Sequence, residues 1–327
     1  GDIILQLPFL KAISDKYNKK IILCVNKHIS IKEILENQYY IDSVIENSFR
    51  KGKFFFYDVL KLTSDLSKKK ITEIFIFEKT KGTAIAAKLA GIKKIYGYGI
   101  GAQKFLVDKS MVLEKNDLRY NYSSQTEKFL NKFNIPTTYD QKFLTLKLSK
   151  KDNFFLKYDK LPKPWACFAI DSTEVNRIWP QKNFAKLADK IIEKKLAKTI
   201  FVINHENHKN YFNALVENSN NKNNFINCKI LNRYEIIHII NVSNFFVGID
   251  SGPSCVAGAL GKKTFCIIGP TDATLPRFTS MKKIVSDIYD QKREIGIKRC
   301  GDNFQQSDFE VKTISVQKVF DTIVNYL

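Results

Sequence analysis

The chain has 327 residues, of which 44% are hydrophobic and 26% are charged. These values are typical of a globular protein long enough for two domains. No apolar run approaches the ~20 residues needed to cross a bilayer. The six cysteines form no C-x-x-C pair and mostly sit in apolar runs. We therefore expect reduced thiols in a cytoplasmic protein, and no metal site.

The formal net charge of +20 has two interpretations. A basic surface attracts phosphates, anionic lipid or nucleic acid. The basic residues are almost all lysine, however, with only seven arginines, and abundant Lys, Asn and Ile also follow from an AT-rich genome. No aromatic–basic motif of an RNA-binding domain accompanies the charge. Nucleic-acid binding would rest on charge alone, and we expect no nucleic-acid partner.

Short β-rich apolar runs alternate with segments of helical period along the chain, which indicates parallel sheets covered by helices. In the first half we expect strands at 20–25, 42–46, 72–77 and 93–98 and helices at 54–69 and 82–89. In the second half we expect strands at 165–170, 199–204, 226–230, 244–249 and 264–268. The helices expected there are 182–194, 208–217, 234–240, 253–260 and a last one within 315–327.

The alternation breaks between about Leu148 and Pro164, in a Lys-rich stretch that ends Leu-Pro-Lys-Pro. Two prolines so close favour extended chain, and we place a domain linker there. The prediction is an N-terminal Rossmann-like domain over 1–150, a C-terminal Rossmann-like domain over 165–312 and a C-terminal helix over 313–327. Two such α/β domains with parallel sheets would face a central cleft, a usual place for a small-molecule site.

The strongest functional signal is the segment 244–260, which reads NFFVGIDSGPSCVAGAL. A buried strand runs into Asp250-Ser251-Gly252-Pro253, and a helix of small residues follows. Pro253 suits the helix start because its missing N–H would be orphaned there. Ser251 and Gly252 offer N–H groups at the positive end of the helix, which predicts an anion site. The alternative is an ordinary helix capped by Asp250 or Ser251.

Further polar residues follow the neighbouring predicted strands. Gly269-Pro270-Thr271 forms a second turn, and two adjacent turns suit a diphosphate. In the segment IDSTEVNRIWP, Ser172 and Thr173 can donate hydrogen bonds to phosphate oxygens. Arg177 adds a permanently charged fork of donors, unless it is simply an exposed surface residue.

Two carboxylates complete the set of candidates. Glu206 follows the strand 199–204, where it is placed to accept both hydroxyls of a ribose or to stabilise a helix start. Asp2 lies at the start of an apolar helix that we expect Pro8 to interrupt. Asp2 could simply cap this helix, or it could act as a catalytic general base. Gly97-x-Gly99-x-Gly101 does not have the spacing of a dinucleotide fingerprint.

Four segments resemble glycosyltransferase family 9, the lipopolysaccharide heptosyltransferases, in chain order. IDSGPSCVAGALGKKTFCIIGPTDA is similar to the donor-site signature of that family, and NRIWPQKNFAKLAD is similar to its phosphate-binding turn and following helix. The N-terminal segment that starts Gly1-Asp2 resembles the family's GD segment. AKLAGIKKIYGYG resembles a first-domain segment that ends in a Gly-Tyr turn. The resemblance covers essentially the whole chain.

The resemblance implies a GT-B fold and an inverting transfer that needs no metal and no cofactor. The implied donor is ADP-heptose, and the implied acceptor is the inner core on lipid A at the cytoplasmic face of the inner membrane. By position, Asp2 would be the catalytic base and Arg177 would contact the donor phosphates. The remaining donor-binding residues would be Ser172, Thr173, Ser251, Gly252 and Thr271 at the diphosphate, Asp250 shaping the site, and Glu206 at the ribose.

The basic first domain then acquires a role. Lys79 and Lys81 lie in a predicted loop, and we expect them to bind the phosphorylated acceptor or the anionic membrane surface with an affinity that falls with salt. The protein would be a monomer, peripheral at the inner membrane.

Two features depart from the family pattern. The family commonly has His where this chain has Cys255, and the strand expected before Gly1 is absent, so we expect a truncated N-terminus and a first domain without its first strand. Two alternatives stay open. One is a family member with another nucleotide sugar or acceptor. The other is a non-catalytic nucleotide-sugar-binding protein, which only Cys255 favours.

Overall fold

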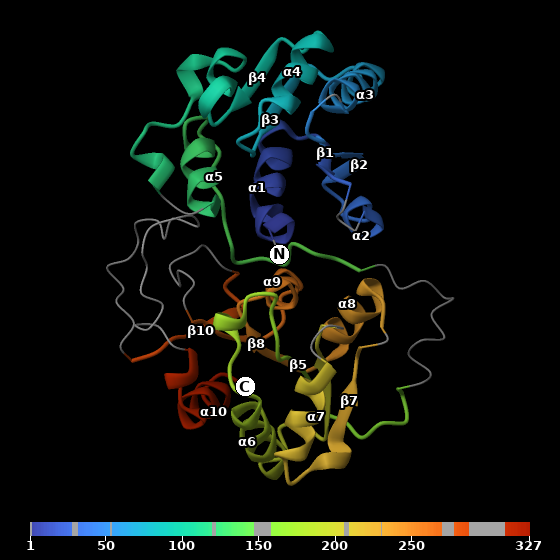
Figure 1. Ribbon diagram of the computed structural model, residues 1–327, viewed down its shortest axis with the longest axis vertical. Helices are drawn as coiled ribbons and strands as arrows, with labels where there is room; N and C mark the ends of the chain where they lie inside the picture. Colours follow the sequence, from blue (N-terminus) through green and yellow to red (C-terminus); the bar gives the residue numbers. More distant parts are fainter. Residues whose placement is uncertain are drawn as a thin grey trace. The chain divides into compact units, whose positions relative to one another are not determined.

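A computed structural model shows an α/β protein (Figure 1). It describes residues 2–27, 32–52, 54–119, 122–146, 158–205, 209–229, 231–269, 278–287 and 311–327. Contacts divide the chain into two compact units, one of Phe9–Thr137 and the other of Gly1–Pro8 with Thr138–Leu327. The greater part of the predicted linker, residues 148–157, lies outside the described residues. None of the described helices is both long and apolar enough to span a membrane.

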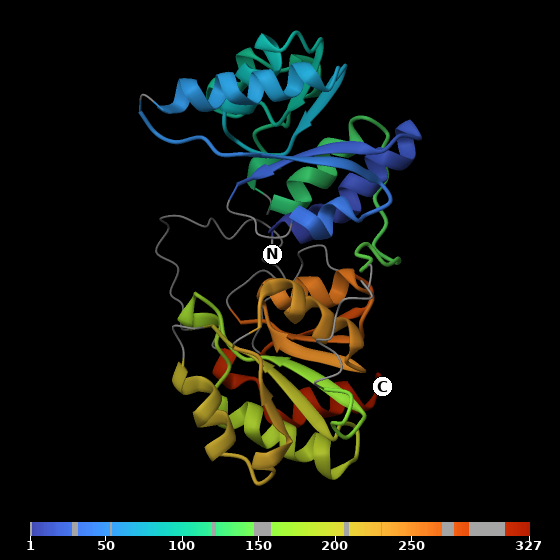
Figure 2. The same ribbon diagram turned by 90° about the vertical axis from the view of Figure 1, so that its right-hand side faces the viewer.

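The larger unit is built on a six-stranded parallel sheet in the order β10-β9-β8-β5-β6-β7. Figure 2 shows this sheet as a middle layer, with α8 and α9 on one face and α6, α7 and α10 on the other. The strands are β5 (Trp165–Ala169), β6 (Thr199–Ile203), β7 (Phe225–Asn227), β8 (Phe245–Ile249), β9 (Thr264–Ile267) and β10 (Met281–Ile284). The helices are α6 (Gln181–Glu193), α7 (Lys209–Glu217), α8 (Arg233–Val242), α9 (Gly252–Ala259) and α10 (Val316–Val324).

The strand order is that of a dinucleotide-binding Rossmann sheet. From β5 the chain moves outward to β6 and β7, and it then returns to the other side of β5 to form β8, β9 and β10. Every residue of β5, β6 and β8 is buried, as expected for parallel strands covered on both faces. The order in which the chain adds strands to the sheet therefore reverses between β5 and β8.

Small residues allow α9 to lie close to the sheet. A Cβ added to Gly248 of β8 would meet the Ser254 hydroxyl oxygen of α9 at 3.0 Å and the Ala169 Cβ at 3.1 Å. On the opposite face, Trp179 is fully buried and donates its indole N–H to the carbonyl oxygen of Ile314 at 2.9 Å. These contacts fix the start of α6 and the start of α9, which both follow strand ends.

The smaller unit contains two separate parallel pairs of strands. β1 (Ile21–Asn26) pairs with β2 (Ile41–Asn47), and β3 (Glu73–Ile76) pairs with β4 (Lys94–Gly97). The helices are α1 (Asp2–Tyr17), which starts in the larger unit, and α2 (Lys32–Glu36), α3 (Phe54–Lys68), α4 (Gly82–Leu89) and α5 (Tyr122–Asn131). Among the described residues, short 3₁₀ turns occur in this unit at Gly101–Phe105, Lys109–Met111 and Asp117–Arg119, and in the larger unit at Val175–Arg177, Lys222–Asn224 and Val311–Thr313.

The predicted strands and helices agree with the structure to within a few residues, but the prediction for Pro8 is wrong. α1 is continuous from Asp2 to Tyr17 with Pro8 inside it. Proline removes one helical hydrogen bond, and Leu7, Phe9 and Leu10 on either side of it are buried. Their packing outweighs that loss and holds the helix together.

Asp189 of α6 is a buried carboxylate whose partners are complete. It accepts hydrogen bonds from the Ser219 hydroxyl at 2.6 Å, the Asn221 amide at 2.8 Å and the Asn220 backbone N–H at 3.1 Å. Burial by itself would raise the pKa of Asp189, but these hydrogen bonds outweigh burial and lower the pKa below its usual value. The carboxylate joins α6 to the loop after α7.

We predict that Asp189→Ala lowers the free energy of unfolding by about 3 kcal/mol, because buried donors lose their acceptor. Since the folded-state pKa is depressed, the stabilisation is complete above the unfolded value of about 4. It is lost as pH falls through the folded-state pKa. Urea unfolding as a function of pH should therefore show a steeper acid loss in the wild type than in the variant. Equal acid loss would contradict this, and the exposed Asp321→Ala serves as a control.

Candidate functional site

The predicted donor site lies where β5, β6 and β8 end. Ala169 of β5 pairs with both Ile203 of β6 and Gly248 of β8. The loops that follow these strands therefore leave the sheet at one edge. Ligands of open α/β sheets bind at the carboxyl ends of the strands, at the point where the strand order reverses. In this sheet that point is between β5 and β8.

The start of α9 has the geometry of an anion site without a side-chain cap. Asp250 continues the sheet, since its N–H donates to the Ile267 carbonyl oxygen at 3.2 Å. Ser251 is the N-cap residue in an extended conformation, and its side chain makes no capping hydrogen bond. Its hydroxyl oxygen is buried and has no hydrogen-bond partner. The alternative in which Ser251 caps the helix is therefore not what the structure shows.

The loop after β5 holds Arg177 in a mostly buried position. Its side chain is only 18% exposed, against 55% for Glu174, with which it forms an ion pair of 2.8 Å through Nη2. The Arg177 Nε is buried without a partner. In the same loop the Ser172 hydroxyl accepts a hydrogen bond from the Glu174 N–H at 3.2 Å, and Thr173 is exposed. Arg177 is thus not a freely solvated surface arginine.

Two further residues at this edge were not predicted from the sequence. Asn204 directly follows β6, is 7% exposed, and has no partner for either its amide nitrogen or its amide oxygen. Gln181 begins α6; its amide nitrogen donates to the Ile170 carbonyl oxygen at 3.2 Å, while its amide oxygen is buried without a partner. The sequence could have pointed to these two residues only by their places, since Asn204 is a polar residue after a buried strand and Gln181 is a polar residue at the start of the adjacent helix.

The edge therefore collects polar atoms that lack partners. Arg177, Gln181, Asn204 and Ser251 each leave at least one buried nitrogen or oxygen unpaired. Folded proteins pair nearly all such groups, and an unpaired one costs free energy. Four of them at the edge that the topology singles out indicate a polar ligand.

The other predicted site residues are distributed as follows. Gly252 is the first residue of α9, whereas Glu206 and Thr271 lie outside the described residues. Asp2 is the exposed first residue of α1. Lys79 and Lys81 are exposed residues of the smaller unit between β3 and α4. The sheet edge thus brings together Ser172, Thr173, Arg177, Asp250, Ser251 and Gly252, while Asp2, Lys79 and Lys81 belong to other segments.

Cys255, where the family commonly has His, lies in the first turn of α9. It is 4% exposed, and its backbone N–H donates to the Ser251 carbonyl oxygen at 3.2 Å. In the part of the chain that the structure describes, no group of three or more His, Cys, Asp and Glu side chains could hold a metal ion.

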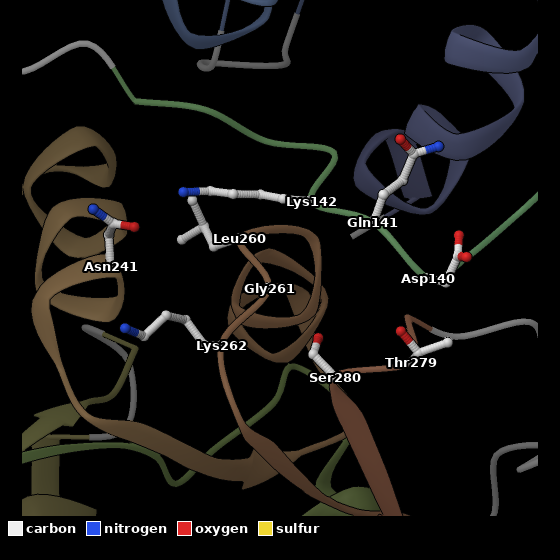
Figure 3. A pocket seen from close by; sticks show the side chains of 9 residues that line it. All are labelled: Asp140, Gln141, Lys142, Asn241, Leu260, Gly261, Lys262, Thr279 and Ser280. Atoms are coloured by element: carbon white, nitrogen blue, oxygen red, sulfur yellow. The ribbon is translucent and has the colours of Figure 1, made fainter.

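A pocket of about 590 Å³ lies at the opposite end of α9 (Figure 3). The helix ends there at Leu260, with Gly261 at a φ of +72° and the paired backbone hydrogen bonds of a Schellman motif. Figure 3 shows the amines of Lys142 and Lys262 on the side of Asn241, away from Asp140. Burial, followed by the charge of Lys142, lowers the pKa of Lys262. None of the predicted donor-binding residues is among its nine described lining residues.

Comparisons with known proteins show the family and the fold of this chain. Residues 59–299 match the family described as glycosyltransferase family 9 (heptosyltransferase). This chain belongs to glycosyltransferase family 9. The matched region includes every predicted site residue except Asp2. No protein of curated function matches the chain in sequence.

Solved structures share the fold over the whole chain. The glycosyltransferase family 9 protein from Veillonella parvula has a TM-score of 0.78 at 15% identity, covering 100% of this chain and 94% of that one. The E. coli ADP-heptose LPS heptosyltransferase II has a TM-score of 0.73 at 16% identity, with 100% and 95% covered. The E. coli heptosyltransferase WaaC, solved with ADP, has a TM-score of 0.69 at 14% identity, with 100% and 97% covered. These likenesses confirm the predicted GT-B fold.

The ion pair between Arg177 and Glu174 generates a prediction about diphosphate binding. Arg177→Gln should weaken pyrophosphate binding by about 10–100-fold, because hydrogen bonds to charged groups are the stronger ones. Glu174→Gln should strengthen binding by up to about 5-fold, because an ion pair whose carboxylate is exposed to solvent is worth at most ~1 kcal/mol in competition with the ligand. Isothermal titration calorimetry with pyrophosphate measures both changes.

A matched control separates this exchange from the effect of net charge. Asp159, in the same unit, pairs with Lys163 at 3.8 Å, and both side chains are 62% exposed. Asp159→Asn removes the same charge as Glu174→Gln but should leave pyrophosphate affinity unchanged. Equal gains in the two variants would show that affinity follows net charge and not the release of Arg177.

Proposed function

We propose that this family 9 glycosyltransferase transfers a heptose from ADP-heptose to the inner core of lipopolysaccharide on lipid A. The observation that most supports a nucleotide-sugar donor is the set of unpaired buried polar atoms at the carboxyl ends of β5, β6 and β8, where the strand order reverses. Of the similar structures, one is an ADP-heptose LPS heptosyltransferase and another was solved with ADP. They support adenosine diphosphate as the carrier of the sugar.

The donor diphosphate would lie between the loops after β5 and β8. Arg177 supplies a fixed positive charge, and the start of α9 at Ser251 and Gly252 supplies N–H groups and the positive end of a helix. As the sugar departs, the diphosphate gains negative charge, and one such contact contributes about 3–4 kcal/mol to the transition state. These groups let the leaving group depart without a metal ion. Ser172, Thr173, Asp250 and Thr271 would complete the diphosphate site, and Glu206 would bind the ribose.

Asp2 is proposed as the general base. The acceptor hydroxyl transfers its proton to the Asp2 carboxylate as its oxygen forms a bond to the anomeric carbon. The bond from that carbon to the diphosphate oxygen breaks on the opposite face, with its electron pair passing to the diphosphate. The configuration at the anomeric carbon is therefore inverted.

A thermal-shift panel of ADP-, UDP- and GDP-sugars on the full chain tests the donor. A ligand at a hundred times its Kd stabilises the folded state by about 2.7 kcal/mol, so ADP-heptose should raise the Tm by several degrees. A larger shift with a UDP- or GDP-sugar would replace ADP-heptose by that donor. No shift with any nucleotide sugar would contradict the proposal.

Asp2→Asn tests the base. We predict that it lowers the transfer rate to a lipid A–core acceptor by about 10²–10⁴-fold while donor affinity stays the same. Asp15→Asn is a matched control, because Asp15 is a carboxylate of the same helix that pairs with Lys11 at 2.5 Å. Wild-type rates in Asp2→Asn would remove the base assignment. Donor binding without any turnover in the wild type would favour the non-catalytic alternative.

We also propose that the protein is a cytoplasmic monomer that associates with the anionic inner face of the membrane; the net charge of +20 supports the membrane association. Lys79→Gln combined with Lys81→Gln should weaken binding to anionic vesicles by about tenfold, since each lysine near such a surface contributes about 1 kcal/mol. High salt should have the same effect. Vesicle co-sedimentation measures this. Lys88→Gln with Lys115→Gln removes equal charge from exposed positions of the same unit and is the control. Equal losses in the two pairs would mean that total charge alone attracts the membrane.

A further inference from the structure

Asn204 stands out among the described residues because its whole side-chain amide is buried and unused. The residue is 7% exposed, and neither its nitrogen nor its oxygen has a partner. Burying an amide without hydrogen bonds is unfavourable, and folded proteins seldom tolerate it. The unpaired amide is therefore best explained by a ligand that supplies both a hydrogen-bond donor and a hydrogen-bond acceptor.

The backbone on both sides of Asn204 is held in place. The Ile170 N–H donates to the Ile203 carbonyl oxygen at 3.2 Å, just before Asn204. Just after it, the His205 N–H donates to the Asp171 carboxylate at 2.6 Å. Both bonds tie the end of β6 to the end of β5. The backbone that carries the amide is thus preorganised, which lowers the cost of ordering this loop around a ligand.

The strand order indicates which part of a bound nucleotide would come near this amide. β6 is separated from β8 by β5 alone, so Asn204 lies about two strand spacings, roughly 10 Å, from the start of α9. A diphosphate that begins at Ser251 and runs along the edge toward β6 places its ribose beside Asn204. In Rossmann sheets the acidic residue that binds a ribose hydroxyl follows the second strand, and β6 is the second strand of this sheet.

We propose that the Asn204 amide binds the ribose hydroxyls of the donor nucleotide, with Oδ1 accepting from one hydroxyl and Nδ2 donating to its neighbour. This inference rests on the proposed function, because it requires a nucleotide at this edge. The amide pairs with two adjacent hydroxyls in complementary senses, and the hydroxyl that accepts from Nδ2 keeps its own hydrogen for the carboxylate proposed at Glu206. Asn204 therefore makes the site specific for ribonucleotides over deoxyribonucleotides.

The test is a double-mutant cycle between the protein and the sugar. Calorimetry on the full chain compares ADP with 2′-deoxy-ADP and 3′-deoxy-ADP, or the corresponding uridine or guanosine set if the donor panel selects one of those. The wild type should bind at least one deoxy analogue about tenfold more weakly, because the amide is then left unpaired. In Asn204→Ala this difference should shrink to about twofold or less.

The ligand-free Tm provides a second readout. If Asn204 served only to stabilise the fold, its removal would lower the Tm. Asn204→Ala removes an unpaired buried amide, so the ligand-free Tm should stay the same or rise by about 2–4 °C. Asn47→Ala is the matched control. Asn47 ends β2 in the smaller unit, is also 7% exposed, and also has a buried amide nitrogen without a partner. This variant should leave nucleotide affinity and deoxy discrimination unchanged.

The outcomes separate the two proposals. If the wild type binds no nucleotide, the proposed function fails and the role of Asn204 fails with it. If the wild type discriminates against a deoxy analogue and Asn204→Ala does so equally, the nucleotide site stands but Asn204 does not bind the ribose. A fall in ligand-free Tm together with equal losses for all three nucleotides would make Asn204 a structural residue and overturn the inference.

Discussion

The site depends on one constraint, which is that the central strands of the larger unit are buried on both faces. No residue of β5, β6 or β8 is exposed, so these strands are almost entirely apolar. Polar residues begin within two residues of their ends, at Asp171, Asn204 and Asp250. Because the strands are parallel and in register, those residues emerge at one edge. The packing that stabilises the sheet thus also concentrates the polar chemistry in one place.

Burial alone does not explain the unpaired atoms at that edge. Asp189 lies in the same unit and is as buried as Asn204, at 7% exposed for each. Asp189 nevertheless has hydrogen bonds from three neighbouring residues, whereas Asn204 has none. Unpaired buried atoms also occur away from this edge, at Asn47 and Trp165, but there each residue leaves a single nitrogen unpaired. At the carboxyl edge of the sheet, Arg177, Gln181, Asn204 and Ser251 occur together, which fits a site where some stability is given up for binding.

Much of this arrangement was predictable from the sequence, because buried parallel strands are short apolar runs and Gly-Pro marks a helix start. What escaped prediction depended on contacts between distant segments. The helical spacing of apolar residues is not visible in α5, because the polar residues Ser123, Gln125 and Thr126 share its buried face. β10 does not look like a buried strand, because Lys282 and Lys283 lie between its buried ends. The sequence around Asn204 does not reveal that its amide lacks hydrogen-bond partners, since that depends on which atoms of other loops lie close to the amide. The roles of all the predicted site residues stay predictions, and Glu206 and Thr271 also lie outside the described residues.

Two arginines show how the same side chain serves different ends in this lysine-rich chain. Arg50 binds the Asp58 carboxylate through both Nε and Nη2, at 3.0 and 2.6 Å, so its fork of donors is used within the smaller unit. Arg177 binds Glu174 through Nη2 alone and keeps a buried Nε unpaired. A lysine at position 177 would offer one point charge that Glu174 could hold entirely. The planar guanidinium can be positioned by one nitrogen and present another to a phosphate, which explains an arginine where lysine is the prevailing choice.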